Sequence, residues 1–98
     1  MGSDFLEACV DCAIECENCA KSCAGELDMC CKYCADCAAL CWLCASFLAR
    51  DSKFAAGLVK LCVKACKLCS SECGKHDHDY CVDCVEACKH CLEHGDVV

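Results

Sequence analysis

The chain has 98 residues, a formal net charge of −7, no proline and five glycines. This length suits one domain spanning residues 1–98, and the acidic charge argues against a nucleic-acid partner, because phosphate binding needs clustered Lys and Arg. No basic segment precedes a long apolar run, and no apolar stretch is expected to span a bilayer. We therefore expect a cytoplasmic protein without membrane contact.

Four helices are predicted in chain order, at about residues 4–24, 26–49, 52–73 and 78–94. Residues that favour helix ends lie at each boundary. The expected start signals are Ser3 for the first helix, Asp51 or Ser52 for the third and Asp77 or Asp79 for the fourth, and the expected stops are Gly25, Gly74 and Gly95. Short connections predict an all-α, antiparallel up-down-up-down four-helix bundle.

Cysteine accounts for 19 residues, and every cysteine except Cys31 recurs at alternating intervals of three and four. That spacing is typical of the inward-facing positions of a bundle, so we expect a cysteine-lined core. The odd count, the helical spacing and the lack of an export signal disfavour a disulfide scaffold. The positions on this seam are Cys9, Cys12, Cys16, Cys19, Cys23, Cys30, Cys34, Cys37, Cys41, Cys44, Cys62, Cys66, Cys69, Cys73, Cys81, Cys84, Cys88 and Cys91.

Antiparallel packing of these helices predicts layers of four cysteines, about 5 Å apart along the bundle. The expected layers are Cys23/Cys30/Cys73/Cys81, Cys19/Cys34/Cys69/Cys84, Cys16/Cys37/Cys66/Cys88 and Cys12/Cys41/Cys62/Cys91, with Cys9 and Cys44 beyond them. One end is expected to be plugged by apolar residues, namely Phe5, Leu6, Phe47, Leu48, Phe54, Leu58 and Val59. The other end carries Met29, Cys31, His76 and His78, which are soft or borderline metal ligands, and we interpret it as the mouth through which metal enters.

A core made almost wholly of thiols indicates metal binding, because Leu or Ile would fill the same space with more apolar burial. Thiolates select Cu(I), Zn(II) or iron–sulfur clusters. A Zn(II) ion with four thiolates carries a charge of −2, and burying several such sites in one bundle is unfavourable. Cu(I) replaces one proton per thiol without adding charge, which predicts roughly 15 to 20 Cu(I) per chain and a core that folds before metal arrives.

Two alternatives remain open. Cys31, Cys34, Cys37 and Cys41 have the C-x2-C-x2-C-x3-C spacing of bacterial ferredoxins, which favours [4Fe-4S] clusters and electron transfer. A zinc or toxic-metal thiolate buffer is the second alternative. We expect no enzymatic activity, because C-x-x-C redox chemistry needs a strand-to-helix context that the pattern lacks. Apolar residues flanking the seams could pack between helices or form an oligomer face: Leu40, Trp42, Leu43, Leu61, Leu68, Val82 and Val85. His90 and His94 are expected on the surface.

Over essentially its whole length the chain resembles the bacterial copper storage protein family. The most specific motif is Glu72–Asp79 (ECGKHDHD), followed by Tyr80 and the cysteines of the last helix. The first helix, from Cys9 to Cys23, is also similar. The resemblance implies Cu(I) storage in thiolate clusters, a homo-oligomer that is often a tetramer, and loading through a histidine-bearing end that matches His76 and His78. Expected partners are metal ions and a copper chaperone or low-molecular-weight thiol.

Overall fold

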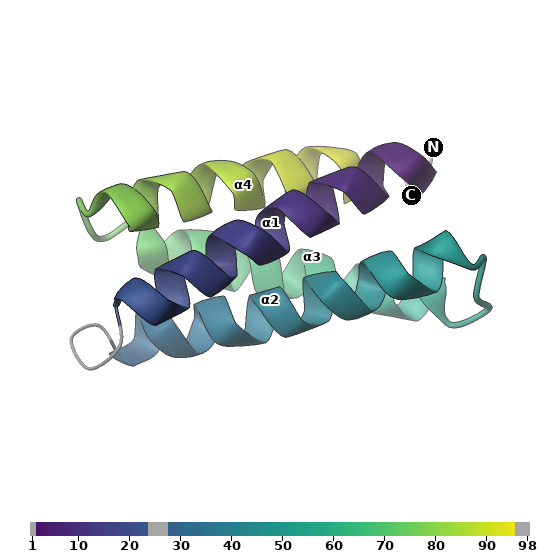
Figure 1. The fold of residues 1–98 in the computed structure, drawn as a ribbon, viewed down its shortest axis with the longest axis horizontal. Helices are drawn as coiled ribbons and strands as arrows, with labels where there is room; N and C mark the ends of the chain where they lie inside the picture. The colour runs from purple at the N-terminus through teal and green to yellow at the C-terminus, as the bar shows by residue number, and fades with distance from the viewer. Residues whose placement is uncertain (1, 24–27, 96–98) are drawn as a thin grey trace.

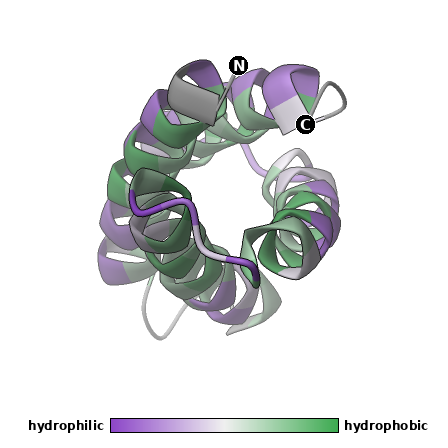
Figure 2. Cartoon of the chain, turned by 90° about the vertical axis from the view of Figure 1, so that its right-hand side faces the viewer, coloured by the Kyte–Doolittle hydropathy of each residue, from purple (hydrophilic) through white to green (hydrophobic). Residues whose placement is uncertain are grey.

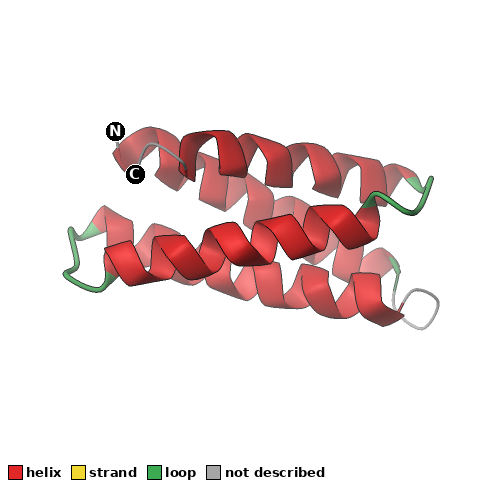
Figure 3. Ribbon diagram, turned by 180° about the vertical axis from the view of Figure 1, so that it is seen from behind, coloured by secondary structure: helices red, strands yellow, loops and turns green. Residues whose placement is uncertain are grey.

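The structure, a computed structural model, describes residues 2–23 and 28–95. Four helices account for nearly all of them: α1 (Gly2–Ser22), α2 (Asp28–Ala49), α3 (Ala55–Cys73) and α4 (Asp79–Gly95). The described ranges contain no strand, and Figure 3 shows the α2–α3 and α3–α4 connections as short loops. The all-α prediction is therefore confirmed.

The helices form an antiparallel bundle 38 × 20 × 17 Å in extent. Each helix packs mainly against its two neighbours, in the order α1, α2, α3, α4 and back to α1. The start of α1 and the end of α4 lie at the same end of the bundle as the α2–α3 connection, whereas the α3–α4 connection lies at the other end (Figure 1). The predicted up-down-up-down topology is confirmed.

The core consists of cysteine with a few small or apolar residues. All eighteen seam cysteines are fully buried, and no charged or polar side chain among the described residues is buried. Ala8, Ala13, Ala38 and Ala45 are buried beside the cysteines, and their small side chains let the helices approach closely. Figure 2, seen along the bundle, shows the apolar faces of the helices turned inward and the hydrophilic ones outward.

The α2–α3 connection differs from the predicted capping scheme. Asp51 adopts a left-handed φ of 52°, and its N–H donates to the Leu48 carbonyl at 3.2 Å, so it terminates α2 instead of starting α3. Ser52 Oγ accepts from the Phe54 N–H at 3.1 Å, which stabilises the turn before the helix. Phe54 occupies the N-cap position without a side-chain cap. The predicted start of α3 was therefore three residues too early.

At the other helix ends, the predicted start residues are wrong and the predicted stops at Gly74 and Gly95 are confirmed. α1 already includes Ser3, so Ser3 does not precede it. The His78 carbonyl accepts the first helical bonds of α4, from Cys81 and Val82, which gives His78 the position expected for Asp77 or Asp79. Gly74 follows α3 and donates to Ser70 at 2.9 Å, as expected of a stop, and α4 runs to Gly95. Gly25 lies outside the described residues.

The apolar plug at one end is present, with one exception. Phe5 is fully buried and Val59 nearly so, and Leu6, Leu48 and Leu58 pack against the core. Phe47 is half-buried beneath the Arg50 guanidinium, 4.3 Å from its ring centroid. Phe54 is 73% exposed, so its inclusion in the plug was wrong. It precedes α3 instead of lying on an inward-facing turn.

Helix α2 is apolar along most of its length, and several apolar side chains of α2, α3 and α4 are exposed. The helix Met29–Ala49 is long and apolar enough to cross a membrane, with a mean hydropathy of 1.3, which contradicts the expectation that no stretch is so long. Its cysteines account for part of that value, and they lie inside the bundle. Of the seam-flanking residues, Trp42, Leu43, Leu61, Leu68 and Val82 are exposed, while Leu40 and Val85 are half-buried.

Candidate metal centre

The buried cysteines form one continuous row of thiols along the bundle axis. All nineteen cysteines are free thiols, and Sγ–Sγ separations between neighbours run from 3.0 Å for Cys30–Cys73 to 4.0 Å for Cys9–Cys62. Contacts join all four helices, and they also join successive turns of one helix, as in Cys37–Cys41 at 3.9 Å. No step along this row needs a sulfur atom to move far.

The layers exist, but α1 is displaced by one step from the predicted register. The closest contacts place Cys19 with Cys30, Cys73 and Cys81, at 3.8 to 4.0 Å. The layers are therefore Cys19/Cys30/Cys73/Cys81, Cys16/Cys34/Cys69/Cys84, Cys12/Cys37/Cys66/Cys88 and Cys9/Cys41/Cys62/Cys91. The helix ends agree with this register, because Ser22 and Asp28 lie symmetrically about residue 25, as Cys19 and Cys30 nearly do, whereas the predicted pair Cys23 and Cys30 is centred later in the chain. Cys23 then lies beyond the first layer, not in it.

Neighbouring layers share their sulfur atoms. Groups of four thiols with Sγ atoms within 4.8 Å of one another include Cys12/Cys37/Cys66/Cys88, Cys12/Cys41/Cys66/Cys91, Cys16/Cys37/Cys69/Cys88, Cys19/Cys30/Cys34/Cys73 and Cys34/Cys69/Cys73/Cys84. Cys12, Cys34 and Cys37 each belong to two of these groups. A shared thiol is positioned to bridge two metal ions, so the row is a chain of overlapping sites and not a set of separate ones.

The sulfur separations suit metal–thiolate bonding. With metal–sulfur bonds of about 2.3 Å, two sulfurs on one ion lie about 3.8–4.0 Å apart in tetrahedral or trigonal geometry and about 4.6 Å apart in linear geometry. The contacts in the row, such as Cys12–Cys66 at 3.8 Å and Cys12–Cys37 at 4.0 Å, lie close to these values. Only small side-chain rotations are needed to admit an ion.

Burial keeps the thiols at the mouth end neutral. Burial, with a further contribution from Cys31, raises the pKa of Cys23 to about 12. Burial, followed by the nearby Cys30, raises the pKa of Cys81 to about 11, and burial also raises the pKa of Cys19. These three thiols therefore keep their protons at neutral pH in the metal-free protein. Each ion that binds must displace protons.

These shifts predict that the metal-free protein loses stability in alkali. A thiol of the unfolded chain loses its proton near its ordinary pKa of 9.0, whereas Cys81 keeps it up to about 11 and Cys23 up to about 12. Above pH 9 the unfolded state therefore binds fewer protons, so the free energy of unfolding falls as pH rises through these values. Anaerobic urea unfolding between pH 7 and 12 measures this fall. A midpoint that stays constant up to pH 12 would contradict it.

Cys31 lies off the row, as its spacing indicates. Its side chain is half-buried, and its thiol donates to the Ala20 carbonyl of α1 at 3.1 Å, beside Cys23. The ferredoxin-like spacing does not produce a cluster site, because Cys31 and Cys41 lie about 15 Å apart along one helix. Cys34, Cys37 and Cys41 belong to three different layers. The spacing arises from the helical seam plus one extra cysteine.

The residues expected at the mouth lie at one end of the bundle but do not converge. Met29 is 45% exposed, and His78 is exposed and stacked on Tyr80 with ring centroids 5.0 Å apart. His76 is different. Its Nε2 is buried and has no hydrogen-bond partner among the described residues, with Glu72 Oε2 at 3.8 Å. His76 and Cys73 line a pocket of about 390 Å³ beside the α3–α4 connection.

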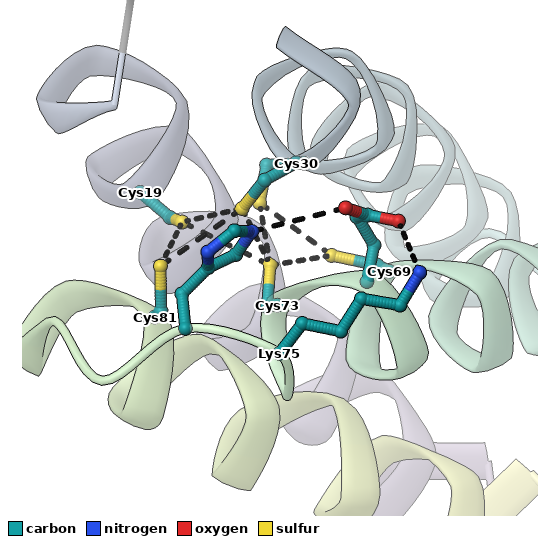
Figure 4. Close-up of polar contacts among 9 residues, drawn as sticks. Cys19, Cys30, Cys69, Cys73, Lys75 and Cys81 are labelled. Carbon is teal, nitrogen blue, oxygen red and sulfur yellow. Dashed lines mark hydrogen bonds and ion pairs between the residues drawn. The ribbon is translucent and has the colours of Figure 1, made fainter. Parts of the chain in front are cut away.

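Glu72 also lies at this end of the bundle. The sequence indicated it only as part of the Glu72–Asp79 motif. Its carboxylate pairs with Lys75 at 3.2 Å and lies 3.8 Å from His76 Nε2. Figure 4 shows Lys75 at the same end as the layer formed by Cys19, Cys30, Cys73 and Cys81. The interval of four between Glu72 and His76, which places two residues on one helical face, could have revealed it. Of the mouth residues, His76 therefore lies best placed to contact both solvent and the thiol row.

Comparison with known proteins agrees with this site. Residues 2–97 match the family described as copper storage protein. An uncharacterised cysteine-rich protein of Bacillus subtilis strain 168, YhjQ, is 39% identical over 93 residues, covering 90% of this chain and 86% of that protein. Two solved structures are similar at 36% identity, each covering 99% of this chain and 97% of the other. They are apo copper storage protein 3 from Bacillus subtilis, with a TM-score of 0.93, and the Cu(I)-bound copper storage protein BsCsp3, with a TM-score of 0.92. On sequence and fold together, the chain belongs to the copper storage protein family.

Proposed function

We propose that this protein stores Cu(I), as thiolate clusters that fill the core of the bundle, and that it has no catalytic role. The proposal rests on the continuous row of buried thiols, in which neighbouring groups of four cysteines share Sγ atoms. The similar BsCsp3 has been solved with Cu(I) bound, and it is 36% identical with nearly the same fold. The site residues are the seam cysteines, with Cys31, Met29, His76 and His78 at the mouth.

Charge and ligand sharing favour Cu(I) over zinc. The overlapping groups compete for the same sulfurs, so tetrahedral zinc sites with four thiolate ligands each could fill only alternate groups. Each such site would also bury a charge of −2 in a core that contains no buried cationic side chain among the described residues. Cu(I) needs only two or three thiolates and tolerates bridging, so it can occupy the whole row with about one ion per thiol. This argument extends to other divalent thiophilic ions.

Anaerobic titration with Cu(I) in the presence of a chromophoric competitor tests the proposal. We expect tight binding of roughly 15 to 20 Cu(I) per chain, because each thiol contributes about one equivalent. Ultraviolet thiolate-to-copper absorption should rise linearly to that point, without visible colour. Saturation far below ten equivalents, or brown iron-containing protein from the native host, would contradict copper storage and favour the iron–sulfur alternative.

We also propose that metal enters beside His76. Its buried Nε2 without a hydrogen-bond partner among the described residues and the pocket shared with Cys73 give an incoming ion a first ligand next to the row. Cys30 and Cys73, whose sulfurs are 3.0 Å apart, are the next ligands inward (Figure 4). From there, ions move along the row by exchange between thiolates. A low-molecular-weight thiol or a copper chaperone would deliver and remove them.

Replacing His76 with Ala should slow loading while leaving capacity nearly unchanged, because the variant loses a ligand that acts only at the first step and keeps every thiol. Replacing His78 with Ala is the comparison variant and should slow loading less, because His78 is exposed and stacked on Tyr80. Stopped-flow ultraviolet absorption with a Cu(I) complex measures both rates. Equal loading rates for wild type and the His76 variant would refute the role of His76.

The remaining parts of the proposal concern location and assembly. We propose a cytoplasmic protein, where a reducing environment keeps nineteen thiols free. We also propose a homo-oligomer, supported by the exposed apolar residues of α2 and α3 and by a groove of about 270 Å³ lined by Tyr33, Leu40, Leu61 and Leu68. Analytical ultracentrifugation would report a monomer of 10.5 kDa if assembly does not occur.

A further inference from the structure

Two histidines lie one helical turn apart near the end of α4, where His90 is exposed and His94 is half-buried. His90 and His94 are four residues apart, so their side chains share one face of the helix. Their ring centroids are 4.7 Å apart, and the ring planes cross at 81°. Neither side chain has a part in the copper core. The pair is therefore free to bind something else.

The geometry of the pair is close to that of two imidazoles on one metal ion. With metal–nitrogen bonds of about 2.1 Å and bond angles between 90° and 109°, two ring centroids lie about 4.6–5.3 Å apart. The observed 4.7 Å falls inside this range. Two histidines at an interval of four on a helix are also the pairing that binds zinc in helical metalloprotease sites. The centroid separation therefore fits two rings on one ion.

Glu93 lies beside one ring of the pair. Its Oε1 lies 3.9 Å from His90 Nδ1, and both side chains are more than half exposed. A carboxylate beside one ring nitrogen favours the tautomer that carries the proton there, which leaves the other nitrogen free to bind metal. The arrangement leaves Nε2 of His90 available. Glu93 is thus a positioning residue for this pair.

An acidic hollow adjoins the same histidine. It has a volume of about 490 Å³ and lies between α1 and α4. Its lining includes His90 and four carboxylates, Asp11, Glu15, Asp83 and Glu86. The carboxylates lower the electrostatic potential at His90, which attracts cations, and Glu86 lies one turn before His90 on the same face of α4. A carboxylate on the same helical face therefore adjoins His90.

We infer that His90 and His94, with a carboxylate of the adjoining hollow, form a second metal site for a divalent ion that prefers imidazole, such as Zn(II). Imidazole and carboxylate are borderline or hard ligands, whereas the core offers only soft thiols. The two sites therefore select different ions. Cu(I) enters the core, and a divalent ion binds outside it on the surface of α4.

Titration with Zn(II) of protein whose core is already loaded with Cu(I) tests this inference. Proton NMR of the four histidines reports the binding residue directly, and a competing zinc dye gives the affinity. We expect one Zn(II) per chain, with shifts confined to His90 and His94. In metal-free protein the core thiols bind Zn(II) first, so the same resonances are followed past saturation of the core, and failure of copper storage is then not mistaken for failure of this site.

Variants separate coordination from simple charge attraction. His90→Gln and His94→Gln should each weaken Zn(II) binding by at least about tenfold, and Glu93→Gln by a smaller factor. Lys89→Gln, an exposed neighbour, is the matched control and should not weaken it. The effect of the histidine variants should persist at high salt, because charge attraction alone is screened. Undiminished Zn(II) binding by His90→Gln, or shifts at His76 and His78 instead, would overturn the inference.

Discussion

Replacing Cys12, Cys37, Cys66 and Cys88 together with Ala should remove about four Cu(I) per chain and also divide the row in two. These thiols form one layer, with Cys12 Sγ lying 3.6 Å from Cys88, 3.8 Å from Cys66 and 4.0 Å from Cys37. Ions entering at the His76 end would then face a gap of about two layer spacings, roughly 10 Å. We expect the layer beyond the gap to fill much more slowly than the layers before it.

The matched control removes an equal number of thiols from the end of the row. Replacing Cys9, Cys41, Cys62 and Cys91 with Ala takes away the layer next to the plug, so no thiols other than Cys44 lie beyond it. Both variants should lose about four equivalents in a Cu(I) titration, but only the first should show a slow second phase of loading. Identical kinetics in the two variants would refute exchange along the row as the route of the metal.

Both variants should be less stable than wild type when metal-free. Removing a buried sulfur resembles removing one buried methyl group, at about 0.5–1.5 kcal/mol each, so four changes lower the free energy of unfolding by roughly 2–6 kcal/mol. That is a large part of the roughly 5–15 kcal/mol typical of a folded domain. Urea unfolding measures the loss, and bound Cu(I) should restore part of it, because ligands that bind only the folded state stabilise it.

The fold was accessible from the sequence because one pattern determines most of it. The alternating intervals of three and four fix which face of each helix points inward, and all eighteen seam cysteines are buried as that pattern requires. The same pattern isolated Cys31, whose thiol bonds to α1 and not to the row. Helix existence and burial follow from periodicity alone, which is a local property of the chain.

The cysteine periodicity did not predict the register of α1 against the other helices or the residues at which the helices start. Sliding α1 by one layer keeps every cysteine on the inward face, so the hydrophobic pattern does not distinguish the two registers. The positions of the two helix ends distinguish them, because α1 ends at Ser22 and α2 begins at Asp28, about a centre that fits the pairing of Cys19 with Cys30. Asp51 similarly suits a helix start by residue type, but its left-handed φ of 52° places it at a helix end. Such features depend on backbone conformation in a few residues.

The sequence also could not predict that His76 Nε2 is buried without a hydrogen-bond partner among the described residues. It gave His76 and His78 the same expected role as ligands at the mouth. The two are separated by a single residue, yet His76 is half-buried, with a buried Nε2 and a pocket shared with Cys73, while His78 lies on the surface stacked on Tyr80. The difference arises because Gly74 ends α3 and the chain then turns back over the end of the bundle. Only the path of that turn decides which histidine faces the thiols.

Phe5 should be the residue outside the thiol row whose loss destabilises the protein most. It is fully buried at the plugged end, where a Cβ added to Gly95 would lie 3.1 Å from its ring. Phe5→Ala removes a large buried side chain, at about 3–5 kcal/mol, which corresponds to a fall in Tm of more than about 12 °C for a domain of this size. Anaerobic thermal unfolding of the metal-free protein followed by circular dichroism measures this shift.

Phe54→Ala is the matched control for Phe5→Ala, because the chemical change is the same and Phe54 is 73% exposed. Its effect on the free energy of unfolding should stay within about 0.5 kcal/mol, as for most surface changes. The Phe5 variant should keep its full Cu(I) capacity, since no thiol is lost, but its open end should admit copper to Cys9 and Cys44 directly. Loading of this variant should therefore depend less on His76. If Phe5→Ala unfolds no more easily than Phe54→Ala, the apolar plug does not close the bundle.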